Sequence, residues 1–338
     1  MREELRNRKI PPLRKREEMI GILLKEEYGI LPPAPEKLFW LDLEEERREG
    51  YCILRKKVFF TLRGRESSFP VSFVIPEGGE KIPSVFLIDF VKEIPNRYFP
   101  VDLLIKEGYG AVHLCYEDIS SDSDDFTKEK TAVFFPEGRR EEDCGKLGLW
   151  SWGIQRVMDL LERDPGPFDL TRAVLAGHSR LGKCVLLTAA IDRRFTCVCS
   201  NDSGCGGAAL FRGKKGEKIA DITGLFPYWF KSGFRDCSGR EGELPFDQHY
   251  LLASIAPRKV LVSSAEEDLW ADPVSEYLSA LAASDAFEKG IKDSLPKAGD
   301  RYQEGDIAFQ MRKGGHFFAE EDWKGLLAWA KEKSAPRT

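Results

Sequence analysis

A serine lies at a turn between an apolar run and a helical pattern, where its hydroxyl could act as a nucleophile. Residues 174–183 read Val-Leu-Ala-Gly-His-Ser-Arg-Leu-Gly-Lys, with Ser179 in the turn. Such a strand–turn–helix, the nucleophile elbow, raises the hydroxyl above a sheet and aims it at a helix N-terminus, where negative charge is favoured. The Gly-x-Ser-x-Gly pattern is incomplete, because Leu181 replaces its last glycine and Gly182 follows one place later. The competing interpretation is an ordinary turn in which Ser179 caps the helix.

A base must accept the proton of such a hydroxyl, and the chain has four histidines to offer. Three of them have surroundings that favour a structural role, within an apolar run, on the turn itself or beside apolar residues: His113, His178 and His249. The fourth, His316, follows the last apolar strand pattern and precedes the closing helical pattern, and two glycines before it permit a tight loop. We therefore predict His316 as the base, against the alternative of a solvated loop histidine.

An acidic side chain would fix the tautomer of that imidazole and stabilise its charged form. By spacing, the segment after the strand pattern at residues 259–263 offers Asp268, with Glu267 as its neighbour. Asp202, at the end of the preceding strand pattern, is the second candidate. The competing interpretation of the later acids is a cap for the helix that begins near Pro273. Reasoning from the residues leaves the choice open.

Strand and helix patterns alternate along most of the chain, and they must bring these side chains together. Short apolar, β-rich runs indicate strands at residues 51–63, 69–75, 84–90, 110–115, 172–177, 195–199, 259–263 and 307–311. Helical spacing of apolar residues indicates helices at residues 16–28, 151–163, 181–191, 273–287 and 320–333. A front hairpin followed by alternating strands and helices is the order of an α/β-hydrolase fold, with a mostly parallel sheet covered by helices on both faces.

The domain organisation follows from the same patterns. We expect a single catalytic domain over residues 51–338, and a charged, helical extension over residues 1–50 that packs on it. Two connections inside the domain, at about residues 119–148 and 203–258, are long and rich in glycine and charge. Connections of that length in a compact domain are usually functional, so we expect lid-like insertions there.

Composition limits the partners of the chain. The formal net charge is −5 over 338 residues without a long block of one sign, which argues against nucleic acid or an anionic membrane surface as a partner. The longest apolar runs are too short for a membrane span, and residues 19–24 are too short for the core of an export signal. The chain as given predicts a cytoplasmic location, or a periplasmic or secreted one if a leader has been removed. The oligomeric state stays open.

Eight cysteines are present, and no two of them have Cys-x-x-Cys spacing, which excludes zinc-ribbon and thioredoxin-like sites. Several lie in apolar runs, such as Cys197 and Cys199, where a free cysteine behaves as a small hydrophobe. We therefore expect most of them to be reduced core residues, although one disulfide stays open. We expect neither a metal nor an organic cofactor.

Several segments combine into a more specific pattern. They are Gly177–Lys183, Ser200–Ala208, Glu243–Asp247, Ile255–Arg258, Trp270–Pro273 and Gly314–His316. Taken in order along roughly residues 80–330, they resemble the glucuronoyl esterases, carbohydrate esterase family fifteen, and its bacterial branch most closely. The first 50 residues show no clear likeness. The resemblance implies an α/β-hydrolase fold and a serine esterase.

The resemblance also implies roles at the reacting group. Ser179 would attack an ester carbonyl, with His316 as its base. In the family the acid often lies 23 residues after the serine, and this position is Asp202 here (202 − 179 = 23). The family usually has the longer glutamate there, and some bacterial members have an acid in the later loop. The resemblance therefore places Asp202 first and the pair Glu267 and Asp268 second.

The remaining roles concern charge and sugar recognition. By the resemblance, Arg180 would direct its guanidinium at the oxyanion, beside its own backbone N–H, and a fixed cation there stabilises developing charge. Lys183 would bind hydroxyls of the uronate, Trp270 would stack or hydrogen-bond at the sugar, and Glu243, in a looser match, would contact the sugar as well.

The expected reaction is acyl transfer to water through a serine-bound acyl enzyme. The family's substrates are esters of 4-O-methyl-glucuronic acid on xylan, where lignin alcohols are attached. Without a visible leader, a small uronate ester or another acyl sugar is also a candidate substrate. The first alternative is a related carbohydrate esterase, such as a xylan deacetylase, and the second is a non-catalytic carbohydrate-binding relative. A peptidase is less favoured, because nothing indicates a propeller domain.

Overall fold

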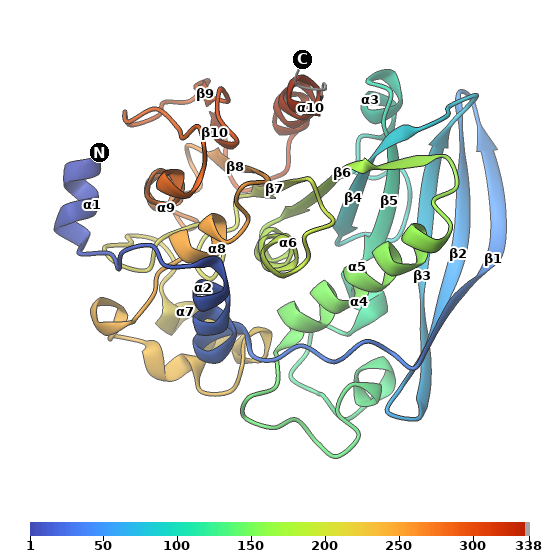
Figure 1. Cartoon of the computed structure of the whole chain (residues 1–338), viewed down its shortest axis with the longest axis horizontal. Coiled ribbons are helices and arrows are strands. Elements are labelled where there is room, and N and C mark those ends of the chain that lie inside the picture. Colours follow the sequence, from blue (N-terminus) through green and yellow to red (C-terminus); the bar gives the residue numbers. More distant parts are fainter. Residues whose placement is uncertain (335–338) are drawn as a thin grey trace.

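Ten strands form one sheet in the order β1-β2-β3-β5-β4-β6-β7-β8-β10-β9 in the computed structural model of the chain, which describes residues 1–334 (Figure 1). The strands are Lys37–Arg48 (β1), Tyr51–Leu62 (β2), Arg65–Pro76 (β3), Ile82–Asp89 (β4), Gly110–Cys115 (β5), Phe168–His178 (β6), Cys197–Asn201 (β7), Lys259–Ala265 (β8), Arg301–Tyr302 (β9) and Ile307–Arg312 (β10). Strands β5, β4, β6, β7, β8 and β10 pair in parallel, while β1, β2 and β3 add an antiparallel meander. This is the α/β-hydrolase fold that the sequence predicts.

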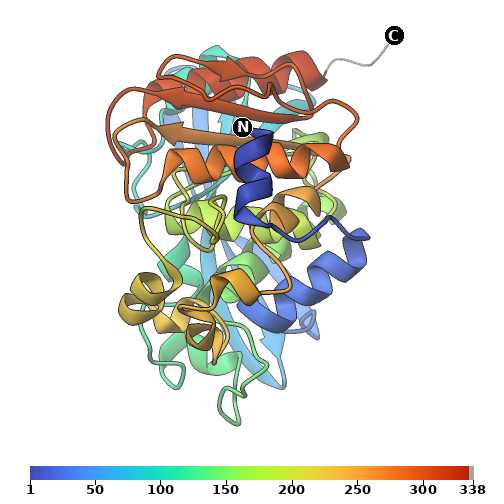
Figure 2. The same ribbon diagram turned by 90° about the vertical axis from the view of Figure 1, so that its left-hand side faces the viewer.

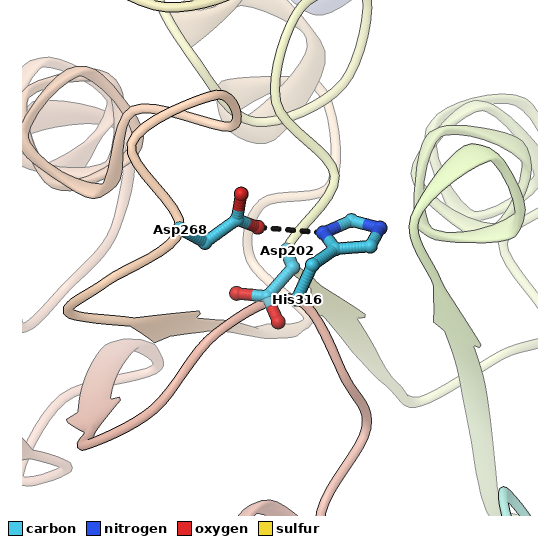
Figure 3. A group of neighbouring side chains, drawn as sticks. All are labelled: Asp202, Asp268 and His316. Carbon is cyan, nitrogen blue, oxygen red and sulfur yellow. Dashed lines mark hydrogen bonds and ion pairs between the residues drawn. The ribbon is translucent and has the colours of Figure 1, made fainter.

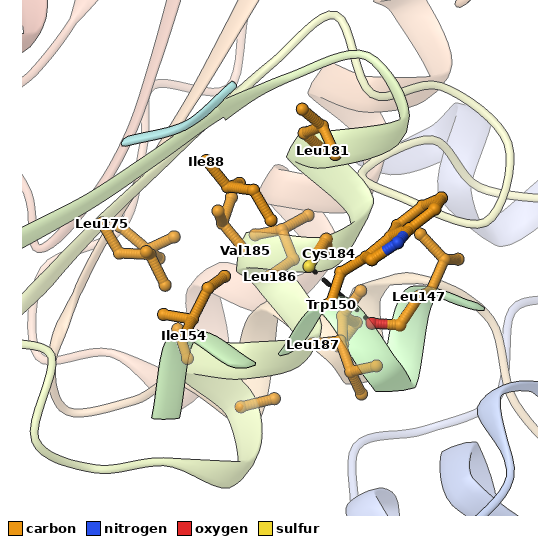
Figure 4. Packing of buried hydrophobic residues seen from close by; sticks show 14 of the residues in the cluster. Ile88, Leu147, Trp150, Ile154, Leu175, Leu181, Cys184, Val185, Leu186 and Leu187 are labelled. Carbon is orange, nitrogen blue, oxygen red and sulfur yellow. Dashed lines mark hydrogen bonds between the residues drawn. The ribbon is translucent and has the colours of Figure 1, made fainter. Parts of the chain in front are cut away.

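Helices cover both faces of this sheet, because its central strands are apolar on both sides. One face holds α5 (Lys146–Arg163), α6 (Arg180–Ile191), α8 (His249–Ala253) and α9 (Pro273–Ala283), and the other holds α3 (Val101–Lys106) and α10 (Glu320–Ser334) (Figure 1). Successive residues of β4 show the alternation: Phe86 and Ile88 belong to the first core, Val85 and Leu87 to the second. Figure 4 shows Ile88 and Leu175 of the sheet packed towards α6 and Trp150.

The first 50 residues depart from the predicted helical extension. Helices α1 (Arg2–Arg8) and α2 (Arg16–Leu23) are present, and a π-helix continues α2 to Tyr28, but β1 is an edge strand of the main sheet. The sequence hides this strand because its outward side chains are solvent-exposed and its second half is rich in charge. At the other end, α1 lies against α9 (Figure 2), where Arg8 Nη1 donates to Ser275 Oγ at 2.9 Å.

The two long connections contain short helices. Between β5 and α5 lie α4 (Tyr116–Ile119) and a 3₁₀ turn at Glu129–Val133. Between β7 and β8 lie α7 (Ile219–Leu225), 3₁₀ turns at Pro227–Trp229, Phe234–Cys237 and Glu241–Glu243, and α8. Helix α5 begins at Lys146, five residues before the expected start at Ser151. In residues 1–334 no helix combines the length and the apolar character that crossing a bilayer requires.

The parallel strands bring the predicted chemistry to one edge of the sheet. Ser179 follows β6, Asp202 follows β7, Asp268 lies after β8 and His316 lies after β10. These four strands are neighbours in the sheet, and their carboxyl ends share an edge, where open α/β sheets bind ligands. We call residues 266–272, between β8 and α9, the acid loop, and residues 313–319, between β10 and α10, the base loop.

Candidate active site

Ser179 occupies the strained turn that a nucleophile elbow requires. Its φ of 56° and ψ of −126° place a non-glycine residue where L-residues rarely lie, which costs roughly 1–3 kcal/mol. Two glycines let the turn pack this tightly: a Cβ at Gly177 would meet the carbonyl oxygen of Leu181, and one at Gly182 would lie 2.9 Å from Ser203 Cβ. Gly182 therefore supplies the close contact with the next loop, which explains why the displaced glycine pattern still forms an elbow.

Hydrogen bonds join Ser179, His316 and Asp268 in series. Ser179 Oγ lies 2.8 Å from His316 Nε2, and His316 Nδ1 lies 2.6 Å from Asp268 Oδ2. If Nδ1 donates to the carboxylate, Nε2 is the acceptor and faces the hydroxyl. Burial alone would raise the pKa of Asp268, but the hydrogen bond and charge of His316 outweigh burial and lower it. An ionised Asp268 is the partner that an imidazolium needs.

Asp202, the acid that the resemblance places first, does not bond to His316. Its Oδ1 accepts the backbone N–H of Ala265 at 2.8 Å, and its Oδ2 lies 3.6 Å from Arg312 Nη2. Figure 3 shows its carboxylate beside the pair, while the dashed bond to the imidazole comes from Asp268. The end of β8 engages one oxygen of this short side chain. Burial and the neighbouring carboxylates raise its pKa well above the usual range, so it is also a poor counter-ion.

Two alternatives from the sequence remain: Glu267 as the acid, and an acidic residue of this loop as the cap of helix α9. Glu267 is exposed, and its backbone N–H donates to Gly314 O at 3.0 Å, which links the acid loop to the base loop. The cap of α9 is Asp272, which accepts the N–H of Ser275 at 3.1 Å. Asp268 is therefore not needed as the cap of α9, and its side chain serves His316.

Arg180 is held beside the nucleophile by a carboxylate and three aromatic rings. Its Nη1 forms an ion pair with Asp122 Oδ2, and the guanidinium carbon lies 4.7 Å from the ring centre of Trp229. The rings of Phe226 and Phe90 lie 5.4 and 5.7 Å away. Within residues 1–334 the Nε of Arg180 has no hydrogen-bond partner. The site thus contains a fixed cation whose Nε is buried.

Asp122 is a residue of the site that sequence reasoning missed. Besides Arg180, it accepts the indole N–H of Trp229 at 2.7 Å and the hydroxyl of Tyr116 at 3.3 Å. It lies in the Ser- and Asp-rich stretch 120–125, inside a connection that the sequence singled out for its length. That stretch was the available signal, but the sequence separation of 58 between Asp122 and Arg180 hides their pairing.

The three predicted sugar contacts lie in different surroundings. Trp270 is 55% exposed on the acid loop and can meet a ligand. Lys183 is only 4% exposed, and its Nζ donates to Ser203 O and lies 3.8 Å from Glu217 Oε2, so protein groups already engage it.

Glu243, the third predicted sugar contact, departs from its expected position. It lies at the surface in a 3₁₀ turn, where it accepts from Arg240 Nε at 2.9 Å. Both side chains of this ion pair are about two-thirds exposed, at 66% for Arg240 and 68% for Glu243. The loose sequence match therefore selected a surface ion pair, and the prediction for Glu243 has no support in this geometry.

The three remaining histidines are buried and bonded to protein groups. His113 Nε2 lies 3.0 Å from Asp89 Oδ2, and His249 Nε2 lies 2.9 Å from Pro11 O. His178 Nδ1 lies 2.6 Å from Asn201 Oδ1, and its ring centre is 4.5 Å from that of His316. Burial lowers the pKa of His178 to about 3, so this imidazole stays neutral beneath the base. Such surroundings suit the structural roles that the sequence favours.

One group in residues 1–334 has the composition and spacing of a metal site: Asp202, Asp268 and His316, with ligand atoms within 4.8 Å of one another. The separation of 2.6 Å between His316 Nδ1 and Asp268 Oδ2 suits a shared proton, and it is too short for two ligands of one ion with bonds of about 2.0–2.2 Å at tetrahedral angles. Arg312 adds a positive charge 3.6 Å from Asp202. The geometry favours a hydrogen-bonded histidine–carboxylate pair over a metal at this position. All eight cysteines are free, six of them buried and two, Cys52 and Cys237, partly exposed.

Comparison with known proteins gives a consistent set of relatives. The family model described as "Glucuronyl esterase, fungi" matches residues 58–289. "Carbohydrate esterase MZ0003", from an unknown prokaryotic organism, is 30% identical over 90% of this chain and 80% of its own length. The "4-O-methyl-glucuronoyl methylesterase" of Hypocrea jecorina is 34% identical over 45% of this chain and 35% of that enzyme.

Solved structures agree with the relatives. The structure titled "Glucuronoyl Esterase from Solibacter usitatus" superposes with a TM-score of 0.86 at 30% identity, covering 94% of this chain and 92% of that one. The likeness therefore extends over nearly the whole of both chains. It includes most of the N-terminal region, for which the sequence showed no clear likeness.

Proposed function

Because the chain belongs to the glucuronyl esterase family, we propose that it hydrolyses carboxylic esters of sugar acids, with glucuronoyl esters, including those of 4-O-methyl-glucuronic acid, as substrates. The observation that carries this proposal is the series of hydrogen bonds that joins Ser179, His316 and Asp268. The guanidinium of Arg180, paired with Asp122, completes the site. Relatives whose names specify 4-O-methyl-glucuronoyl methylesterase support the substrate class.

The first step forms a bond between Ser179 Oγ and the ester carbonyl carbon. His316 Nε2 takes the hydroxyl proton as that bond forms, since the two atoms already lie at hydrogen-bond distance. Asp268 then faces a charged imidazolium through Nδ1 and stabilises it without taking the proton. The strained turn at Ser179 holds the hydroxyl in place before the substrate arrives.

Negative charge develops on the carbonyl oxygen during this step. The guanidinium of Arg180 and the N-terminus of α6, which both directly follow Ser179 in the chain, would supply positive potential for that oxygen. Asp122 and the aromatic rings fix the guanidinium in advance, so little reorganisation accompanies the reaction.

The tetrahedral intermediate collapses when the C–O bond to the alcohol breaks and His316 returns its proton to the leaving oxygen. The uronoyl group remains on Ser179 as an ester. Water then attacks that carbonyl with His316 again as the base, and the second collapse releases the uronic acid and the free hydroxyl. Trp270, exposed on the acid loop two residues after Asp268, is our proposed contact for the sugar ring.

Two measurements test this proposal. Methyl glucuronate should be cleaved far faster than an acetylated xylose, and a reversed preference would favour the deacetylase alternative instead. Ser179→Ala should abolish turnover and labelling by a fluorophosphonate, with His249→Gln as a control histidine variant remote from the serine. Full turnover by Ser179→Ala would refute the proposed nucleophile, and an unlabelled, inactive wild-type chain would leave the non-catalytic carbohydrate-binding alternative.

A further inference from the structure

The base loop has little intrinsic rigidity. It contains Gly314 and Gly315 directly before His316, and Gly314 adopts a φ of +94°. Glycine gives the backbone more freedom than any other residue, so a loop with two of them needs external constraints to hold one conformation. His316 must nevertheless keep its Nε2 within 2.8 Å of Ser179 Oγ.

The constraint comes from the side chain of Arg312, the last residue of β10. Its guanidinium donates to main-chain carbonyls on both sides of His316: Lys313 at 2.8 Å, Gly315 at 3.0 Å, and Phe317. The planar fork of arginine offers several donors at fixed angles, whereas the single ammonium of lysine cannot copy this arrangement. Three carbonyls within five residues thus face one rigid group.

Buried carboxyl groups anchor that guanidinium in turn. Arg312 Nε donates to Asp322 Oδ2 at 2.6 Å, and the same oxygen accepts the N–H of Ala319 at 2.9 Å near the start of α10. Asp322 Oδ1 accepts the hydroxyl of Ser263 on β8 at 2.7 Å. The cation is therefore fixed to both β8 and α10, and the base loop is fixed to the cation.

The acid loop is tied to the same residues. The N–H of Glu266 donates to Arg312 O at 2.9 Å, and the N–H of Glu267 donates to Gly314 O at 3.0 Å. Asp202 lies 3.6 Å from the guanidinium and accepts the N–H of Ala265, the last residue before the acid loop. Arg312 thus lies at the junction of the two loops that present Asp268 and His316.

We propose that Arg312 is a positioning residue for the proposed esterase reaction, whose guanidinium sets the conformation of the base loop and the distance between His316 and Ser179. The inference rests on the proposed function, because it assigns Arg312 a role through His316 alone. Arg312 touches neither the nucleophile nor the site of the oxyanion in the contacts described above. Its removal should therefore lower kcat and the reactivity of Ser179, and leave KM nearly unchanged.

The surroundings of Arg312 permit a chemical rescue. The residue lines a cavity of about 520 Å³ together with Gln310, Asp322 and the exposed Arg301. In Arg312→Ala, free guanidine at millimolar, non-denaturing concentrations can enter this cavity and replace the missing group. Arg301→Ala is the matched control, because it removes a guanidinium from the same cavity without touching the base loop carbonyls.

We expect Arg312→Ala to lower kcat by about 100-fold, the cost typical of a catalytic group displaced by about 1 Å, and guanidine to recover on the order of tenfold. Equal concentrations of sodium chloride should recover nothing, and Arg301→Ala should match the wild type. A folded Arg312→Ala chain with wild-type kcat, or one that guanidine does not rescue, would overturn the inference. If that variant does not fold, Arg312→Lys replaces it in the test, and a wild-type kcat there would be equally decisive.

Fluorophosphonate labelling separates this inference from the proposed function. It reports the nucleophilicity of Ser179 whatever the natural ester is. Failure of the wild-type chain to label would contradict the proposed function itself. A wild-type chain that labels, with Arg312→Ala labelling at the same rate, would leave the proposed function standing and refute the positioning role alone.

Discussion

The two sides of Ser179 are held by different means. On the base side, Arg312 bonds to main-chain carbonyls of a glycine-containing loop, and buried carboxyl groups lie behind it. On the oxyanion side, Arg180 is carried by helix α6, and only its guanidinium is held, by Asp122 and a set of aromatic rings. A helix fixes the backbone by itself, so its functional group needs support only at the tip, whereas a loop residue needs its backbone fixed first.

The largest expected effect separates the two acids on the base side. Asp268→Asn should lower kcat/KM by roughly 10⁴-fold, because the amide cannot stabilise the imidazolium and favours the wrong tautomer. Asp202→Asn keeps an oxygen for the Ala265 N–H and should lose far less. Steady-state kinetics of both variants at several pH values provides the measurement. A greater loss of kcat/KM in Asp202→Asn than in Asp268→Asn would instead identify Asp202 as the acid, as the family resemblance implies.

The second prediction concerns the oxyanion side. Arg180→Ala should cost about 10²–10³-fold in kcat, which is typical for the loss of one oxyanion donor. Asp122→Asn should cost less, because the amide still accepts from Trp229 and the aromatic rings still surround the guanidinium. Measuring kcat and KM for both variants ranks them. If kcat of Asp122→Asn were lower than kcat of Arg180→Ala, the aromatic rings alone would not be enough to hold Arg180.

The smallest expected effect is on stability and concerns one buried carboxyl group on α9, outside both sides of Ser179. Glu276 on α9 accepts the N–H of Gly204 at 2.8 Å and the hydroxyl of Ser264, and burial raises its pKa from 4.5 to about 7. A raised folded-state pKa contributes stability that is complete below about pH 4.5 and is lost as the pH rises through about 7.

Glu276→Gln removes that titration, and the comparison with the wild type isolates it. The free energy of unfolding of the wild type should fall relative to the variant by roughly 3 kcal/mol at most between pH 4.5 and 8. Urea unfolding at several pH values measures the difference. Parallel curves for the two chains would show that Glu276 does not titrate in this range.

The same contrast explains what could be predicted from the sequence. Strands β4 to β8 and β10 are short apolar runs between helical patterns, and the sequence places all of them within a few residues. The exposed edge strand β1 was missed, because burial is what makes a strand visible in sequence. Ser179 and His316 were identified by the residues around them in short segments. The small number of histidines in the chain also narrowed the choice of base.

The remaining site residues depend on distances that no short segment encodes. Asp202 and Asp268 have similar sequence signals, and only the position of each carboxylate relative to His316 Nδ1 separates them. Asp122 and Arg180 are far apart in sequence, and so are Glu217 and the Lys183 that it approaches. Lys183 belongs to the segment Gly177–Lys183 that the sequence singled out. Its burial against Ser203 depends on the folded structure and could not be predicted from that segment.

The placement of the sulfur atoms sets how the chain would respond to oxidants. Burial raises the pKa of Cys144 and Cys197 to about 12, so their reactive thiolate is scarce at neutral pH and shielded from solvent. Burial also raises the pKa of Cys52, and that of Cys237 to about 11, but these two side chains are only partly covered, so they would be the first to form sulfenic acid or mixed disulfides. Both lie outside the series Ser179–His316–Asp268, so mild oxidation would modify the periphery and spare ester cleavage.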